Sequence, residues 1–380
     1  MKVILSVYPI REPLTGIGQY TWELAAGLKV HDGVSDIKFF DLGYWVDDLD
    51  KLLISRSGSG LRMALTGSLI AISIYDKISP LLLGSRLDGY DDYIYHSPNF
   101  MLPPFSGLKI STFHDLSVFR CPEYHRNAQV RLMEKEIHKA LNQADRLIAI
   151  SEFTKNEIIE LFGYPDDKVV VVPNGVSPDF FPRCTKELDA PLAVFGLIPG
   201  RYFLSVATIE PRKNIDSILD AYEMLPKIIR MEYPLVICGG AGWKSEGTLE
   251  RIKNMMKEGD VRYLGYVKEE MKPLLYAGAT AVVFVPFYEG FGLPVLEAMA
   301  SGVPVVASDI PPLNEVSAGS SYKVLPQDVE EIARLMQKMV GSDGRRQQKT
   351  IFGLNVAQEF SWKNTVEKTV FQYRGLVGEQ

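Results

Sequence analysis

The sequence predicts an α/β protein with two doubly wound, Rossmann-like domains, each built on a parallel sheet. Three observations predict this fold class. The chain has 380 residues, more than one ordinary hydrophobic core holds. Short β-branched runs alternate with segments of helical length, and a cluster of turn-forming residues at 173–178 separates two such series. Ligands bind such sheets at the carboxyl ends of the strands, so we expect the two domains to face a shared cleft.

The predicted strands are short runs rich in β-branched residues, which we interpret as buried parallel strands. The first series comprises residues 2–7, 108–113, 146–150 and 168–172. The second series comprises residues 202–207, 235–238, 261–264, 281–285 and 303–307. We place the domain boundary at residue 182, so that the first domain covers residues 1–182 and the second covers residues 183–361.

Composition and charge disfavour several classes of protein. The 41 basic and 47 acidic residues give a net charge of −6, which argues against nucleic acid as a partner. Cys121, Cys184 and Cys238 form no C-x-x-C pair, so neither a disulfide framework nor a cysteine zinc site is expected. The N-terminus is typical of a strand and not of a signal peptide, and the uncharged run 63–75 has 13 residues, too few to span a bilayer. We therefore expect a cytoplasmic protein.

The most informative segment runs from Glu289 to Glu297 and follows a predicted strand. Its order is strand, glycine turn and helix, with Pro294 suited to the first helical position. Backbone N–H groups at such a helix start favour a phosphate. Glu289 precedes the turn and Glu297 lies about one turn into the helix, so two carboxylates would face one ligand and accept hydrogen bonds from sugar hydroxyls. The alternative is a helix-end charge beside an unrelated loop charge.

Two adjacent cations, Arg212 and Lys213, follow the first predicted strand of the second domain. The arginine fork and the compact lysine charge suit a pyrophosphate, and both would stabilise the negative charge that grows as a phosphate departs. We expect alanine at these positions to lower turnover more than stability. The alternative is a solvated surface pair.

Two further candidates lie in the first domain. Gly16-Ile17-Gly18 links the opening strand to a helix and forms half of a dinucleotide fingerprint, but Thr21 stands where a glycine or alanine is required. It suits a loop that approaches phosphate better than it suits a dehydrogenase. His114-Asp115 follows the strand 108–113, where a neutral imidazole can bind a sugar hydroxyl or a backbone carbonyl while Asp115 or another group fixes its tautomer. The alternative for His114 is a structural histidine.

These motifs resemble those of the large retaining glycosyltransferase family 4, whose members have the GT-B fold of two Rossmann-like domains. The resemblance covers most of the chain, and the pattern from Glu289 to Glu297 matches the family's E-x7-E signature. The other matching stretches are Gly16 to Gly18, Phe113 to Leu116, Ser151 to Thr154, Pro173 to Val176 and Glu210 to Asn214.

The resemblance implies a role for each candidate in the second domain. Glu289 would contact the donor sugar near the reacting centre and Glu297 would hold the nucleotide ribose. Arg212 and Lys213 would clamp the diphosphate. Sugar or phosphate would also contact the backbone N–H groups of Phe291, Gly292 and Leu293.

In the first domain the resemblance places His114 beside the primary hydroxyl of the donor sugar and the Gly16 to Gly18 loop over the phosphates. It also implies a C-terminal helix within residues 362–380 that crosses back and completes the first domain. The resemblance also implies that no metal or other cofactor is needed. No Asp-x-Asp motif, which could bind a metal, stands at the end of a predicted cleft strand, and Asp47-Asp48 and Asp91-Asp92 are typical of turns.

The pattern is most similar to bacterial mannosyltransferases of O-antigen and exopolysaccharide assembly. It implies GDP-mannose as donor and a lipid-linked saccharide as acceptor, with a UDP- or dTDP-sugar as the alternative donor. The alternative classes are a nicotinamide oxidoreductase, a pyridoxal-phosphate phosphorylase and a non-catalytic nucleotide-sugar-binding protein. The segment Lys51 to Arg86 carries five basic residues and one acidic residue. It is either a peripheral membrane contact at the inner face of the cytoplasmic membrane or a buried helix with a basic edge.

Overall fold

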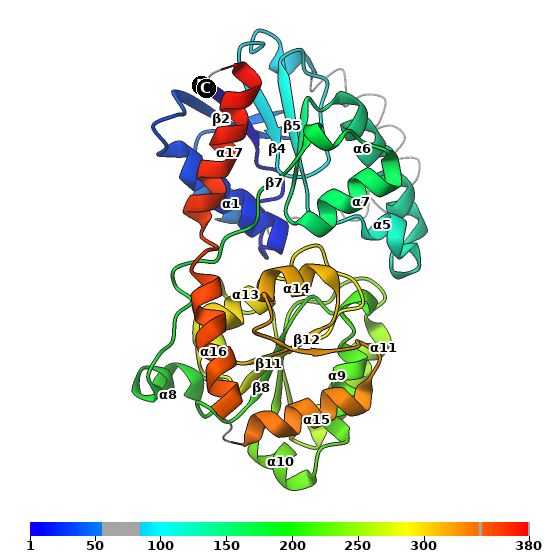
Figure 1. The fold of residues 1–380 in the computed structure, drawn as a ribbon, viewed down its shortest axis with the longest axis vertical. Helices are drawn as coiled ribbons and strands as arrows, with labels where there is room; N and C mark the ends of the chain where they lie inside the picture. Colours follow the sequence, from blue (N-terminus) through cyan, green and yellow to red (C-terminus); the bar gives the residue numbers. More distant parts are fainter. Residues whose placement is uncertain (55–83, 342–343, 379–380) are drawn as a thin grey trace. The chain divides into compact units, whose positions relative to one another are not determined.

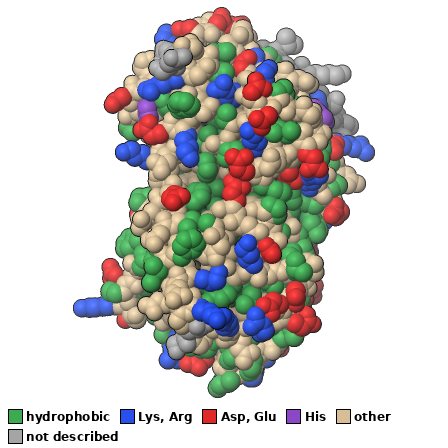
Figure 2. Space-filling view, in the orientation of Figure 1, with side chains coloured by type: hydrophobic (Ala, Val, Ile, Leu, Met, Phe, Trp, Pro, Cys, Tyr) green, Lys and Arg blue, Asp and Glu red, His purple; other side chains and the backbone are tan. Residues whose placement is uncertain are grey.

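The computed structural model describes residues 1–54, 84–341 and 344–378, and it divides into two α/β units (Figure 1). Unit 1 contains Met1–Gly175 and Trp362–Gln380, and unit 2 contains Val176–Ser361. The division falls inside the predicted turn cluster, earlier than residue 182. Within the described ranges, no helix has the length and apolar character to cross a membrane. On the face that Figure 2 shows, acidic and basic side chains are interspersed.

Unit 1 is built on a sheet whose described strands run in the order β3-β2-β1-β4-β5-β6-β7. All neighbouring strands are parallel except β2 and β3, which are antiparallel. The strand bounds are β1 Lys2–Ser6, β2 Asp36–Asp41, β3 Tyr44–Val46, β4 Ile94–Ser97, β5 Leu108–Phe113, β6 Arg146–Ala149 and β7 Val169–Val171.

Helices cover both faces of this sheet, which explains why β1 is apolar at consecutive positions. Val3 and Leu5 pack in a core with α1 and α17, whereas Ile4 between them packs in the core that includes α6 and α7. The helix bounds in unit 1 are α1 Gly16–Lys29, α2 Asp50–Ile54, α5 Ser117–Arg120, α6 Asn127–Gln143, α7 Glu152–Phe162 and α17 Trp362–Val377.

The C-terminal helix α17 returns to unit 1 and packs against α1, as predicted (Figure 1). The two helices approach closely at Gly27, where an added Cβ would lie 2.4 Å from Val366 Cγ2. Trp362, Val366 and Tyr373 of α17 are buried in the same core as β1. The last segment of the chain is therefore part of the first hydrophobic core.

Unit 2 is built on a parallel sheet in the order β10-β9-β8-β11-β12-β13. The strand bounds are β8 Phe203–Val206, β9 Leu235–Cys238, β10 Val261–Gly265, β11 Ala281–Phe284, β12 Val305–Ser308 and β13 Tyr322–Val324. The helix bounds are α8 Thr185–Ala193, α9 Ile215–Glu223, α10 Lys227–Glu232, α11 Glu246–Lys257, α12 Lys272–Ala277, α13 Leu293–Ala300, α14 Pro311–Ser317, α15 Val329–Val340 and α16 Gly344–Ala357. Helices α9, α11 and α15 pack in one core against this sheet, and α13 contacts α12, α14 and α16.

Candidate functional site

The strand order of unit 2 reverses between β8 and β11, since strands are added first on one side of β8 and then on the other. At such a reversal the loops that follow the two strands diverge and leave room for a ligand beyond the carboxyl ends. Strand β8 leads to the 3₁₀ turn Pro211–Lys213, and β11 leads to Glu289 and the start of α13. The fold thus brings together the motifs predicted for the second domain.

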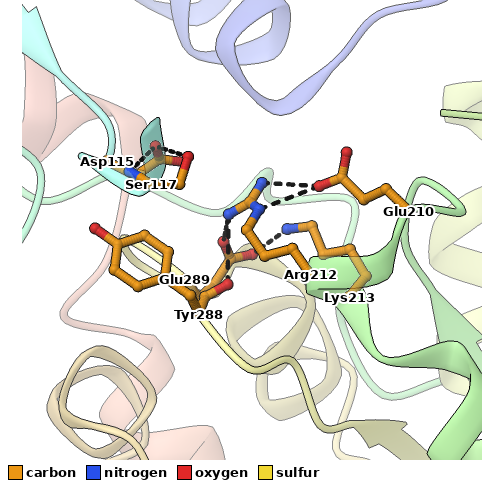
Figure 3. Close-up of polar contacts among 7 residues, drawn as sticks. All are labelled: Asp115, Ser117, Glu210, Arg212, Lys213, Tyr288 and Glu289. Atoms are coloured by element: carbon orange, nitrogen blue, oxygen red, sulfur yellow. Dashed lines mark hydrogen bonds and ion pairs between the residues drawn. The ribbon is translucent and has the colours of Figure 1, made fainter. Parts of the chain in front are cut away.

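Four charged side chains form a buried cluster at this reversal (Figure 3). Arg212 lies between two carboxylates: its Nη2 is 3.0 Å from Glu210 Oε1, and its Nη1 is 3.3 Å from Glu289 Oε2. Arg212 Nη1 also donates to the Tyr288 carbonyl oxygen at 3.4 Å, and Lys213 Nζ lies 2.7 Å from Glu289 Oε1. The charged side chains are 2% to 13% exposed. The two cations are therefore balanced by two carboxylates and are not solvated surface charges.

Asn214 holds the turn that carries these cations. Its backbone is left-handed, with φ of 56°, a conformation that asparagine tolerates better than most residues. Its amide Nδ2 donates to the carbonyl oxygens of Val285 at 2.8 Å and Pro326 at 2.7 Å. The Phe287 backbone N–H donates to the Arg212 carbonyl oxygen at 2.9 Å. These bonds fasten the turn after β8 to the end of β11.

The start of helix α13 depends on Gly292. Its φ is 107°, and an added Cβ would lie 2.3 Å from Leu313 Cδ2. Leu293 is the first helical residue, and no side chain in the described part of the chain caps the helix. Phe291 before it is buried and packs edge-on against Phe360. The first backbone N–H groups of α13 and the positive end of its dipole are thus available to an anion.

Glu297 lies in α13 but pairs with a different cation from Glu289. Its Oε1 is 3.5 Å from Lys272 Nζ of helix α12. Burial raises the pKa of Glu297, while the cation of Lys272 and the hydroxyl of Tyr276 act to lower it. The two glutamates of the E-x7-E motif therefore have separate electrostatic environments.

In unit 1, His114 follows β5 and its Nε2 lies 2.8 Å from the Pro98 carbonyl oxygen. Burial lowers the pKa of His114 to about 4, against smaller opposing effects of Pro98 and Asp115. The imidazole is therefore neutral at pH 7, and the carbonyl fixes the tautomer in which Nε2 carries the proton. Asp115 instead accepts from Ser117, through the backbone N–H at 3.0 Å and the hydroxyl at 2.8 Å (Figure 3). His114 Nδ1 is left as an acceptor, which suits a hydroxyl donor.

A buried hydrogen-bonded chain supports the position of His114. His96 Nδ1 lies 2.6 Å from the Tyr373 hydroxyl, and His96 Nε2 lies 2.8 Å from Thr112 Oγ1. Thr112 Oγ1 also lies 3.1 Å from the Tyr20 hydroxyl, and the Tyr20 ring contacts the His114 ring edge-on at 4.9 Å. Burial, with a smaller effect of His114, lowers the pKa of His96 to about 3. The chain thus links α17, the sheet and α1 to the candidate site histidine.

Gly16 and Gly18 were expected in a loop, and the structure corrects this: they form the first turn of α1. Thr15 is the N-cap, and its hydroxyl accepts from the Gly18 N–H at 3.3 Å, which explains why the helix begins so early. A Cβ on Gly18 would lie 3.0 Å from the Pro9 carbonyl oxygen, so close backbone packing also requires glycine here. Helix α1 is the element that follows the carboxyl end of β1 in the chain.

Comparison with known proteins agrees with this arrangement. The model of the family "Glycosyltransferase Family 4" matches residues 86–180, and that of "Glycosyl transferases group 1" matches residues 199–351. The chain is 39% identical to the O-antigen chain mannosyltransferase B of Escherichia coli, over 99% of this chain and 100% of that protein. The chain belongs to glycosyltransferase family 4.

Solved structures show that this family 4 glycosyltransferase has the predicted GT-B fold. HepE from Anabaena, in complex with UDP-glucose, superimposes with a TM-score of 0.73 at 15% identity, over 99% of each chain. WaaG, a glycosyltransferase involved in lipopolysaccharide biosynthesis, gives 0.72 at 14% identity, over 97% of this chain and 98% of its own. At these identities the likeness concerns the fold alone.

Sequence reasoning on this glycosyltransferase missed several residues that shape the site. Glu210 lies within the stretch Glu210 to Asn214 that resembles family 4, yet nothing in the sequence shows that it pairs with Arg212. Lys272 carried no signal, because its partners are distant in sequence. The same holds for Tyr20 and Tyr373, which look like ordinary core residues until the fold brings them to His96 and Thr112.

Proposed function

We propose that this enzyme transfers mannose from GDP-mannose to a lipid-linked saccharide, with retention of anomeric configuration, in the assembly of a bacterial surface polysaccharide. The observation that carries the binding of a sugar nucleotide is the buried cluster of Arg212 and Lys213 beside the start of α13, which no side chain of the described residues caps. The choice of mannose and of a surface polysaccharide as the product rests on the likeness to the O-antigen chain mannosyltransferase B of E. coli.

The charge balance of the cluster suggests how it works. Glu289 contacts Nη1 of Arg212 and Nζ of Lys213. Phosphate oxygens of the donor would replace this carboxylate, because a diphosphate carries more charge and also reaches the helix start. Glu289 would then be free to accept from hydroxyls of the mannose. Glu210 would keep its contact with Arg212 throughout and hold the guanidinium in place.

In the proposed reaction the acceptor hydroxyl attacks the face that the nucleotide leaves. The bond from the anomeric carbon to the phosphate oxygen breaks, the bond to the acceptor oxygen forms, and the departing phosphate oxygen takes the proton. Arg212, Lys213 and the α13 dipole stabilise the growing negative charge. Backbone N–H groups at Phe291, Gly292 and Leu293 would contact sugar or phosphate.

The remaining roles are also proposals. Glu297 would hold the ribose hydroxyls of the nucleotide. His114 Nδ1 would accept from the primary hydroxyl of the sugar, which the neutral imidazole permits. The N-terminus of α1, at Gly16 and Gly18, would lie near the phosphates.

A panel of sugar nucleotides tests the donor. Thermal stabilisation and slow donor hydrolysis are measured with GDP-mannose, UDP-glucose, UDP-galactose and dTDP-rhamnose, and GDP-mannose should give the largest effect in both. A stronger response to a UDP- or dTDP-sugar would replace GDP-mannose as donor. NMR of the product from the α-linked donor should show an α-linkage, and a β-linkage would exclude retention.

Docking at a membrane surface through Lys51 to Arg86 remains a prediction. Most of this segment, residues 55–83, lies outside the described residues. Flotation with anionic vesicles at low and high salt tests it: salt-sensitive binding that Arg56→Gln and Arg62→Gln weaken is expected, since each nearby cation contributes about 1 kcal/mol. Absence of binding at low salt would exclude this surface.

A further inference from the structure

Lys272 is the first residue of α12 and lies in an unusual place for a lysine. A cation at a helix start opposes the helix dipole. Its side chain is nevertheless only 20% exposed, and Nζ lies 3.0 Å from Glu269 Oε2 and 3.5 Å from Glu297 Oε1. Since the local helix disfavours this cation, the two carboxylates must account for its position.

The groups around Glu297 show why Lys272 matters for the charge of this glutamate. Tyr276 of α12 is fully buried, and its hydroxyl makes no hydrogen bond of good geometry with the described residues, although it is close enough to lower the pKa of Glu297. Glu269, before α12, repels a negative charge on Glu297. Burial raises the pKa of the nearby Cys238 thiol to about 12, so it is neutral. Lys272 is thus the cation that acts on Glu297 within the described structure.

The charge of Glu297 matters for its proposed task. A carboxylate accepts hydrogen bonds at both oxygens, whereas a protonated carboxyl uses one oxygen as a donor. Two neighbouring ribose hydroxyls that both donate therefore need the ionised form. Burial and Glu269 both favour the protonated form, and Lys272 opposes them.

We propose that Lys272 is a positioning residue that holds Glu297 as an ionised, fixed acceptor for the ribose hydroxyls, so that nucleotide affinity does not depend on the protonation of Glu297 near neutral pH. This inference rests on the ribose-binding role of Glu297 in the proposed function. It assigns a third buried cation to the donor site, in addition to Arg212 and Lys213, and this cation acts on the nucleoside end and not on the phosphates.

The test is the dissociation constant of GDP, measured by calorimetry from pH 5.5 to 8.5. The variant is Lys272→Met, which keeps the length of the side chain and removes the charge. The matched control is Lys268→Met, a nearby lysine that is exposed. Each Kd is divided by the wild-type Kd at the same pH, which removes the titration of GDP itself.

For Lys272→Met we expect binding about 10- to 100-fold weaker at pH 6.5, the size of a lost hydrogen bond to a charged group. The ratio of the Kd of the variant to that of the wild type should fall toward 1 as pH rises, because Glu297 then ionises even without the cation of Lys272. Lys268→Met should give a ratio near 1 throughout. A ratio that is near 1 or constant with pH for Lys272→Met would overturn the inference, since a merely structural lysine gives no rescue by pH.

Two further variants keep the test decisive if Lys272→Met folds poorly, as judged by circular dichroism. Glu269→Gln removes the repelling charge, so loss of GDP affinity at acidic pH should move to lower pH; no movement would contradict the proposal. Glu297→Gln should bind weakly at every pH, and adding Lys272→Met to it should cause no further loss. If the wild type binds none of GDP, UDP and dTDP, the proposed function fails, and the inference with it.

Discussion

Replacing Arg212 by methionine tests whether the arginine and Glu210 form a buried pair that stability requires. The Glu210 side chain is 2% exposed, and Arg212 is the partner of its carboxylate in the described structure. In Arg212→Met, Glu289 still has Lys213 as a partner, at 2.7 Å in the wild type. The substitution therefore leaves mainly the buried charge of Glu210 without a cation. Breaking a buried pair from one side costs about 3–5 kcal/mol, and we expect a loss of that size. The sequence alone had suggested that folding would be little affected.

The double variant Glu210→Gln/Arg212→Met separates stability from catalysis. Because both charges are gone, we expect it to regain about 1–3 kcal/mol of the lost stability. Turnover should stay about 10²- to 10³-fold below wild type in both variants, since the cation that stabilises the departing phosphate is missing. Unfolding in urea and the initial rate of GDP release from GDP-mannose are the two measurements.

A surface arginine of the same unit is the control. Arg251 pairs with Asp220 and Glu223 but is 29% exposed, and Arg251→Met should cost about 1 kcal/mol or less. Unfolding of Arg212→Met at the same urea concentration as the wild type would refute a stabilising buried pair, and recovery of turnover together with stability in the double variant would refute the catalytic role of Arg212.

Three other predictions concern backbone and buried histidine. Gly292→Ala should lose about 1–3 kcal/mol and weaken GDP binding, because φ is 107° and the new Cβ meets the flexible end of Leu313. Gly239→Ala should unfold at a lower temperature than Gly292→Ala, because φ is 144° and its Cβ would lie 1.8 Å from the rigid Ala207 carbonyl oxygen; the opposite order in thermal unfolding would contradict this. The pKa of His96 is about 3 in the folded state, below the value of about 6.5 in the unfolded chain. The contribution of neutral His96 to the free energy of unfolding is therefore complete above about pH 6.5 and is lost as pH falls toward 3. Urea unfolding is measured at pH 7, 6 and 5. Between pH 6 and 5 the free energy of unfolding of His96→Gln should fall by about 1.2 kcal/mol less than that of the wild type, and equal falls would refute this prediction.

The sequence predicted most of the strands that are rich in β-branched residues, but it missed others, among them β2 and β4, for physical reasons. Strand β4 contains His96 and Ser97, both buried, because polar side chains there belong to an internal hydrogen-bonded network. Strand β2 contains Asp36, Lys38 and Asp41, since it lies near the edge of the sheet and only its second half is buried. Such strands have no continuous apolar run, so an apolar pattern cannot reveal them.

The candidate site was predictable where residues are close in sequence to a strand end. Arg212, Lys213 and Glu289 each follow a predicted strand of one parallel sheet, and the fold puts them in contact. Lys272 could not be predicted, because a lysine after two glutamates is typical of an exposed turn. Its burial depends on how α12 packs against α13, which no local pattern encodes.

The position of α17 has a consequence for synthesis on the ribosome. Unit 2 is one continuous segment and can complete its core while the chain is still being made. Unit 1 cannot, because the residues that cover α1 and bond His96 are translated only after unit 2. At about 5–20 residues per second, the N-terminal half waits about 10 to 40 seconds after its last strand has emerged. During that time the apolar face of α1 is uncovered, so a nascent chain that stalls before residue 362 should be a substrate for chaperones even though its second half is already folded.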